Sequence, residues 1–254
     1  MSLKLLSNRK WLLVAASMLL LVVLTGCTSP TETLKTADLL QGNFWERNVV
    51  YYFSLALDTF AGWFQGSYGL AILLLTIIVR FLILPLTIKQ IRSSKEMQKI
   101  QPQMLEIKKK YKDNPQKQQE ETMKMFQKHG INPLAGCLPL VIQMPIFIAL
   151  YNAIYMNSEI REHTFLWLKL GEADPYYVLP IIAAITTYLQ SKMMQNQMQP
   201  AMQFMMLVFP VLIFVMSISF PAALPLYWVF SNIFTIVQNY FLYRDKDKEV
   251  QPAK

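Results

Sequence analysis

Five apolar segments constrain the fold of this chain more than any other feature of its sequence. Each is close to the roughly 20 residues that an α-helix needs to cross the hydrocarbon core of a bilayer. The segments are residues 67–86, 136–155, 176–191, 203–220 and 224–243. The composition agrees, since 54% of the residues are hydrophobic and 16% are charged, against about 25% charged in an ordinary soluble domain. The sequence therefore predicts an all-α membrane protein with five transmembrane helices.

The amino terminus is similar to a bacterial lipoprotein signal. Basic residues precede an apolar run at residues 11–24, and small residues then lead to Cys27. In such signals the small residues admit the peptidase, and the cysteine thiol receives a diacylglyceryl group. We expect residues 1–26 to be removed, so that the mature chain begins at lipidated Cys27 on the outer face. The alternative is that the run remains as an uncleaved transmembrane helix.

The distribution of Lys and Arg sets the predicted orientation. If Cys27 is outside, the cytoplasmic segments are residues 87–135, 192–202 and 244–254, and the external segments are residues 27–66 and 156–175. The cytoplasmic segments carry 16 basic residues and the external segments carry four, as the positive-inside rule requires. We therefore expect a bacterial cell membrane protein with an outer amino terminus and a cytoplasmic carboxyl terminus.

Two of the polar segments are expected to be helical. Residues 44–65 are apolar and aromatic but interrupted by charges, which favours an amphipathic helix in the outer interface after an external tether. Residues 87–135 predict a cytoplasmic hairpin, in which one helix continues from the first span, turns at residues 113–115 and returns as residues 116–128. The hairpin has a net charge of +6. It is either a solvated charged surface or a docking site for anionic lipid head groups, ribosomal RNA or acidic nascent chains.

Arg80 is the candidate functional residue of the first span. It lies 13 residues after Ser67, which is about 20 Å into the membrane at 1.5 Å per residue. Thr76 falls on the same helical face. No Asp or Glu occurs in the five spans, and an arginine in a membrane without a counterion is costly. Arg80 therefore indicates a hydrated cavity or an acidic partner that arrives from elsewhere, unless its side chain extends to the inner interface.

Polar residues of other spans extend this candidate site. Gln143 lies in the second predicted span and Gln190 near the inner end of the third. In the last span Trp228, Asn232 and Thr235 fall within about 40° of one another on a helix. Together with Arg80 these residues predict one cavity that is open to the cytoplasm. For each residue alone, the alternative is a hydrogen bond between helices.

The sequence offers no constellation for covalent chemistry. Its two histidines, His129 and His163, are far apart in polar segments, which makes a metal pair improbable. Phosphate-cradling glycine loops, paired catalytic carboxylates and nucleophile–base arrangements are not recognisable. We therefore expect no enzyme activity, no cofactor and no metal site.

Short motifs spread over nearly the whole mature chain identify a known family. They lie at residues 68–70, 80–86, 89–95, 101–102, 132–139, 143–146, 220–224 and 226–228. In these motifs the chain resembles the YidC insertases of bacterial membranes, in the lipoprotein version of single-membrane bacteria. The resemblance implies five core helices around a hydrophilic groove, with Arg80 as its positive residue and Gln143, Gln190 and Trp228 as its lining.

The resemblance also implies a function and partners. Such proteins insert and help fold integral membrane proteins, alone or beside the Sec translocon, and a nascent membrane protein would be the substrate. Contact with membrane lipids, function as a monomer and no DNA binding are expected. The short tail at residues 244–254 predicts weak ribosome docking. The competing classes are a small-solute channel or transporter, which would usually show repeated halves, and a lipid-anchored assembly scaffold.

Overall fold

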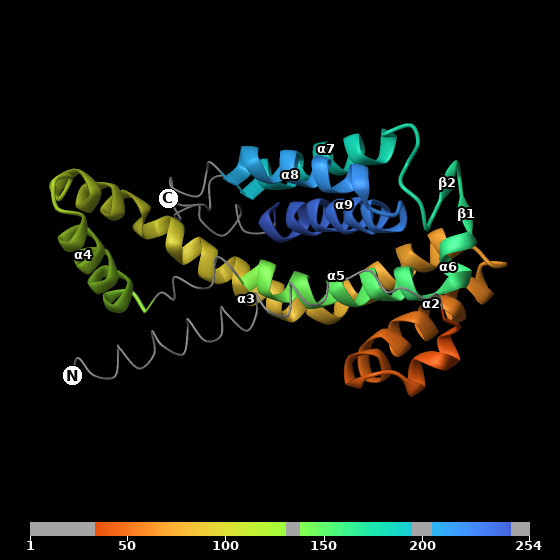
Figure 1. Cartoon of the computed structure of the whole chain (residues 1–254). Coiled ribbons are helices and arrows are strands. Elements are labelled where there is room, and N and C mark those ends of the chain that lie inside the picture. Colours follow the sequence, from red (N-terminus) through yellow and green to blue (C-terminus); the bar gives the residue numbers. More distant parts are fainter. Residues whose placement is uncertain (1–33, 131–137, 195–204, 245–254) are drawn as a thin grey trace.

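The computed structural model describes residues 34–130, 138–194 and 205–244 (Figure 1). The predicted signal at residues 1–26, the lipidation site Cys27 and the tail after Arg244 lie outside the described residues, as do residues 131–137 and 195–204. Most of the described residues are helical. In chain order the elements are η1 (Thr36–Gln41), η2 (Glu46–Val50), α2 (Tyr51–Trp63), α3 (Tyr68–Lys110), α4 (Pro115–Lys128), α5 (Leu138–Met156), α6 (Ser158–Glu162), β1 (Thr164–Phe165), β2 (Leu168–Lys169), α7 (Val178–Met194), α8 (Met205–Ser219) and α9 (Ala223–Arg244).

Each of the five predicted spans is helical, in α3, α5, α7, α8 and α9. Among the described residues, one helix is long and apolar enough by itself to cross a membrane, over Tyr68–Met97 of α3. Shorter apolar stretches occupy Val141–Met156 and Val208–Ser219. That the other four helices also cross a bilayer stays a prediction.

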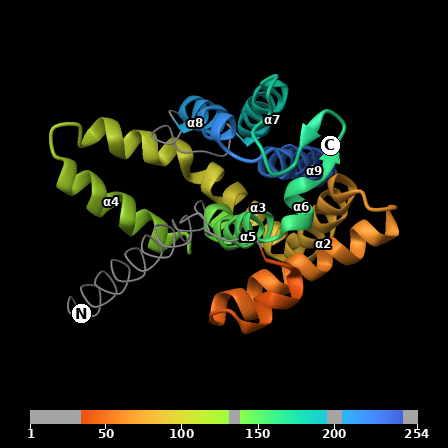
Figure 2. The same cartoon turned by 45° about the vertical axis from the view of Figure 1, so that its right-hand side comes forward.

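The helices form two groups that meet along α9. Figures 1 and 2 show α2, α3 and α5 on one side and α7 and α8 on the other, with α9 between them. Helix α9 packs against both α3 and α7. The shared core contains fully buried aliphatic side chains from several elements, among them Leu57, Ile72, Ile154 and Leu224. The position of α9 brings its polar side chains close to α3 on one side and α7 on the other.

The polar segment after the first predicted span forms a helical hairpin of α3 and α4, and its cytoplasmic position stays a prediction. Helix α3 continues without interruption through Pro85 and Pro102 to Lys110. Helix α4 begins at Pro115, and the Asn114 side chain accepts a 3.0 Å hydrogen bond from the Lys117 amide, which caps its first turn. A small apolar cluster of Ile100, Met125 and Phe126 joins the two helices.

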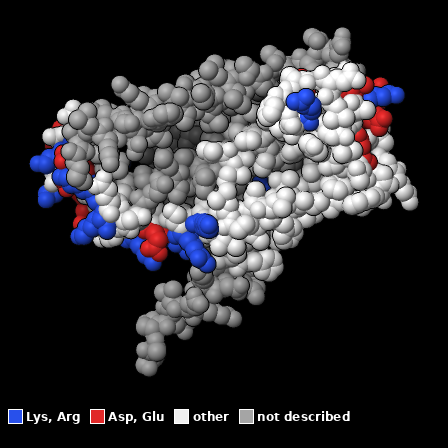
Figure 3. All heavy atoms as spheres, turned by 90° about the horizontal axis from the view of Figure 1, so that it is seen from below, with Lys and Arg blue, Asp and Glu red and all other residues white. Residues whose placement is uncertain are grey.

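Charged side chains gather at the two ends of the molecule. On the face that Figure 3 shows, Lys and Arg with some acidic residues gather over the hairpin end and a mixed group lies at the opposite end, while the described surface between them is mostly uncharged. An uncharged band between two charged ends is the surface expected of a chain that crosses a bilayer.

The segment between α5 and α7 contains a small β-hairpin, which corrects the all-α prediction. Strands β1 and β2 pair antiparallel, with Thr164 opposite Lys169 and Phe165 opposite Leu168. Two residues per strand are too few to show an alternating pattern in the sequence. The segment also contacts the start of α9, because the carbonyls of Leu170 and Glu172 accept hydrogen bonds from the amides of Ala223, the first residue of that helix, and of Ala222 before it.

The predicted external tether is partly packed against the helices. Leu34 pairs with Asn157 in a parallel bridge, donating to the Met156 carbonyl at 2.6 Å and accepting from the Ser158 amide at 3.3 Å. Leu39 is fully buried. We call residues 34–41 the N-terminal strap. Backbone pairing and a buried leucine therefore fix these residues to the bundle.

The predicted amphipathic helix is present as η2 and α2. Its inner face buries Ser54, Leu57 and Ala61 against the bundle, while Tyr52 and Trp63 remain exposed. Exposed aromatic rings beside the long apolar helix α3 suit the lipid interface. Its predicted position in the outer interface stays a prediction.

Candidate functional site

Arg80 joins three helices. Its side chain is half-buried on α3, and its Nη2 atom donates a 3.3 Å hydrogen bond to Oε1 of Gln143 on α5. The same nitrogen donates to the hydroxyl of Ser231 on α9. Two residues far apart in the sequence, Arg80 and Gln143, are thus brought together as the sequence analysis expected.

A tyrosine completes this arrangement. Nε2 of Gln143 donates a 2.6 Å hydrogen bond to the hydroxyl of Tyr227, one turn before Ser231 on α9. We call Arg80, Gln143, Tyr227 and Ser231 the Arg80 cluster. Tyr227 and Ser231 are buried, with exposed fractions of 5% and 3%. Their side of α9 therefore presents two hydroxyls at the depth of Arg80.

The Arg80 cluster has no acidic member. The ion pairs of the described residues join Lys99, Lys124 and Lys169 to nearby glutamates outside the apolar helices, and none of them includes Arg80. The hydrogen-bond acceptors of Arg80 are an amide oxygen and a hydroxyl. A guanidinium presents five N–H donors and prefers bidentate carboxylate partners. The cluster therefore satisfies Arg80 in part and leaves its charge without a counterion among the described residues.

A second polar cluster joins α7 to α9. Nδ2 of Asn232 donates to the hydroxyls of Thr186 and Thr187, at 3.1 and 2.9 Å. Nε1 of Trp228 donates to the Thr187 hydroxyl at 3.2 Å. We call these four residues the α7 cluster. Trp228 and Asn232 thus bind α7 instead of facing Arg80, because they lie about 100° around α9 from Tyr227 and Ser231.

The remaining predicted site residues join neither cluster. The hydroxyls of Thr76 and Thr235 donate to carbonyls of their own helices, at 2.7 and 2.8 Å. Both threonines are buried. Gln190 is half-buried on α7 and makes no hydrogen bond with either cluster. Arg80 and Gln143 therefore lie in one hydrogen-bonded cluster and Trp228 and Asn232 in another, and that these residues line one cavity stays a prediction.

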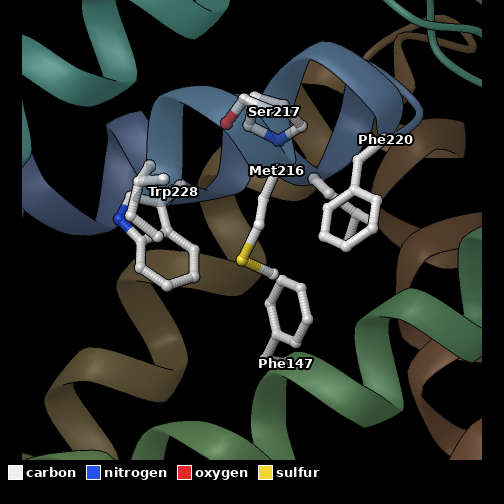
Figure 4. A pocket seen from close by; sticks show the side chains of 8 residues that line it. Phe147, Met216, Ser217, Phe220 and Trp228 are labelled. Carbon is white, nitrogen blue, oxygen red and sulfur yellow. The ribbon is translucent and has the colours of Figure 1, made fainter. Parts of the chain in front are cut away.

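Trp228 also lines a small apolar pocket between α5, α8 and α9. Figure 4 shows its ring near Met216, whose side chain points toward Phe147. Phe220 and Ser217 contribute to the same lining. The space suits about one water molecule, and its walls are almost entirely apolar. It can accommodate side-chain movement but offers no polar binding site.

Comparison with known proteins assigns the chain to a family. The family model described as 60Kd inner membrane protein matches residues 59–249. Membrane protein insertase MisCA of Bacillus subtilis (strain 168) is 49% identical over 242 residues, which cover 92% of this chain and 91% of the relative. Membrane protein insertase YidC 2 of Bacillus anthracis is 44% identical over 254 residues, 97% of either chain.

The likeness to a solved structure agrees with this family assignment. That structure is described as an active YidC insertase crystal structure with the first transmembrane domain resolved, and it aligns with a TM-score of 0.62 and 28% identity. The alignment covers 79% of this chain and 47% of that one, so the chain spans about half the length of the solved relative. The fold and its relatives define a helical membrane protein of the insertase class. The chain belongs to the 60Kd inner membrane protein family, which includes the YidC insertases.

The comparisons confirm two expectations from the sequence. The resemblance to YidC insertases is confirmed by the family model and by the curated relatives. The prediction that the chain is not an enzyme is confirmed as well, because the family consists of insertases, which do not catalyse a covalent reaction.

Proposed function

We propose that this chain inserts membrane proteins by binding a hydrophilic, often acidic, segment of a nascent membrane protein at Arg80. The segment enters from the cytoplasm through a hydrophilic groove, and the adjoining apolar helix then leaves sideways into lipid. The names of the relatives support the general activity. The single observation that supports the role of Arg80 is its half-buried guanidinium with uncharged partners.

The electrostatics favour a transient complex. Two unit charges 4 Å apart attract by about 4 kcal/mol at an effective dielectric constant of about 20. A carboxylate on the substrate would supply the counterion that Arg80 lacks, and it would shorten the path of that segment through hydrocarbon. Release follows when the apolar helix is buried in lipid, since about 25 cal/mol is gained for each Å² of apolar surface removed from water. No energy-coupling site is needed for such a cycle.

The proposed topology places α3, α5, α7, α8 and α9 across the bacterial cell membrane. The amino terminus is outside and anchored by lipidated Cys27 after removal of residues 1–26, and the hairpin of α3 and α4 is cytoplasmic. The separation of charges in Figure 3 supports this arrangement. Over the described residues, the hairpin carries more Lys and Arg than the opposite end, which suits the cytoplasmic side.

The proposed partners follow from this topology. Nascent membrane proteins are the substrates, the protein acts as a monomer, and the Sec translocon is an optional partner. The basic hairpin would contact anionic lipid head groups or the ribosome.

The test is insertion of a single-span substrate with an acidic tail into liposomes that contain only this protein. Protease protection of the substrate is compared for wild type, Arg80→Ala and Arg80→Lys. The control is Lys192→Ala, which removes an exposed positive charge near the end of α7. Loss of protection in Arg80→Ala alone supports the proposal. Equal loss in Arg80→Ala and Arg80→Lys, at normal expression, would show that guanidinium geometry or packing matters instead of charge.

A further inference from the structure

We propose that the uncharged side chain of Ser231 keeps Arg80 available to acidic segments, because the neutral hydroxyl that accepts its hydrogen bond can be displaced by a substrate carboxylate. This inference rests on the proposed insertase function. Ser231 is a positioning residue here. Its hydroxyl holds the Arg80 guanidinium in position without neutralising its charge.

The geometry gives Ser231 this position. It lies on α9, which packs against α3, and its hydroxyl accepts a hydrogen bond from Nη2 of Arg80. The backbone at Ser231 is also fixed, because its carbonyl accepts a 2.8 Å hydrogen bond from the hydroxyl of Thr235. With 3% of its surface exposed, Ser231 has little freedom to move away. The guanidinium is therefore held at a defined place between two helices.

The chemistry makes this partner replaceable. A carboxylate carries a full negative charge, which attracts the guanidinium beyond the hydrogen bond itself, and it can accept two parallel N–H···O bonds from Arg80. Ser231 and Gln143 each offer a neutral oxygen, so a carboxylate competes favourably for the donors of Arg80. A neutral polar segment offers no such advantage. The uncharged character of position 231 therefore favours acidic segments over neutral ones.

A substitution that adds a negative charge at position 231 would place a carboxylate that competes for Arg80 inside the protein. An aspartate at position 231 would lie within reach of Arg80 and pair with it permanently. Because that carboxylate is tethered to α9, a substrate carboxylate would have to displace a partner of equal chemistry. Asparagine at the same position would remain neutral and displaceable.

The experiment compares two matched single-span substrates in the same liposome assay. One has an acidic tail, and in the other the acidic residues are replaced by glutamine. The variants are Ser231→Asp, Ser231→Asn and Ser231→Ala. The matched control is Ser191→Asp, which adds the same charge at a half-buried serine of α7 outside both clusters. Heat unfolding in detergent checks that each variant is folded.

The expected result is a loss of at least tenfold in insertion of the acidic substrate by Ser231→Asp, with the neutral substrate within about twofold of wild type. Ser231→Asn, Ser231→Ala and Ser191→Asp should retain the ratio between the two substrates. A folded Ser231→Asp that inserts the acidic substrate like wild type overturns the inference. So does equal loss of both substrates in Ser231→Asn and Ser231→Ala, because Ser231 would then serve packing alone.

The two proposals fail in different ways. If wild type and Arg80→Ala insert the acidic substrate equally well, the proposed role of Arg80 fails, and the inference on Ser231 fails with it. If Arg80→Ala loses the acidic substrate but Ser231→Asp does not, the role of Arg80 stands and only the inference on Ser231 is overturned.

Discussion

Gln143 on α5 and Tyr227 on α9 are joined by a hydrogen bond of 2.6 Å, in which the amide nitrogen donates to the tyrosine hydroxyl. The oxygen of the same amide accepts from Arg80 on α3. One glutamine side chain therefore connects α3, α5 and α9. Its orientation is set at both ends, since donor and acceptor are each engaged.

Replacing Tyr227 by phenylalanine should destabilise the protein. The variant removes the acceptor for Nε2 of Gln143 and leaves the ring in place. We expect a loss of about 1 kcal/mol, typical of a hydrogen bond between membrane helices, measured by heat unfolding in detergent. The control is Tyr188→Phe on an exposed face of α7. Equal shifts in the two variants would contradict the prediction.

Replacing Asn232 by alanine should weaken the contact between α7 and α9. The side chain is 5% exposed and donates to two threonine hydroxyls of α7. Its removal should cost about 1–2 kcal/mol, measured by unfolding in increasing SDS. Thr235→Val is the matched control, because the Thr235 hydroxyl bonds only within α9. If Thr235→Val proves as damaging as Asn232→Ala, the α7 cluster does not hold the helices together.

Replacing Gly69 by alanine should also destabilise the chain. A Cβ atom at this position would lie 2.1 Å from the ring of Phe165 in β1, so the β-hairpin would have to move away from α3. We expect a loss of about 1–3 kcal/mol from overpacking, measured by heat unfolding. At Gly62 in α2 a Cβ meets nothing within 4 Å, so Gly62→Ala should be neutral or slightly stabilising. The opposite order of stabilities would be inconsistent with this packing.

Replacing Asn157 by alanine should release the N-terminal strap. The Asn157 side chain is 1% exposed, and it donates to the Thr36 hydroxyl at 2.9 Å and to Asp58 at 3.2 Å. Without these bonds, trypsin should cleave after Lys35 faster, since cleavage requires local opening of the backbone. The exposed Asn48, which bonds only within its own helix, provides the control Asn48→Ala. Unchanged cleavage in Asn157→Ala would show that the backbone bridge alone holds the strap.

The sequence predicted the helices well because each depends on local signals. Apolar length located the five predicted spans, and the turn signal at residues 113–115 located the hairpin to within a residue. The strap and the β-hairpin were missed for a physical reason. Both depend on backbone hydrogen bonds between distant segments, as at Leu34 and Asn157, and such bonds leave no periodic pattern.

The candidate site was predicted only in part. Arg80 and Gln143 stood out because a charge and an amide are unusual within apolar segments, and the structure brings them together. Ser231 and Tyr227 were missed because serine and tyrosine are ordinary packing residues in a membrane helix. Trp228 and Asn232 lie on one polar face of α9, as the sequence indicated. Helical phase alone does not say which neighbouring helix this face contacts.

The continuity of α3 has a mechanical consequence. Its 43 residues extend for about 65 Å at 1.5 Å per residue, more than twice the roughly 30 Å of hydrocarbon in a bilayer. Arg80 and the first helix of the hairpin therefore lie on one continuous helix. If the hairpin is cytoplasmic, as proposed, a partner that tilts it would move the guanidinium relative to α9 and so transmit force to the interior of the membrane.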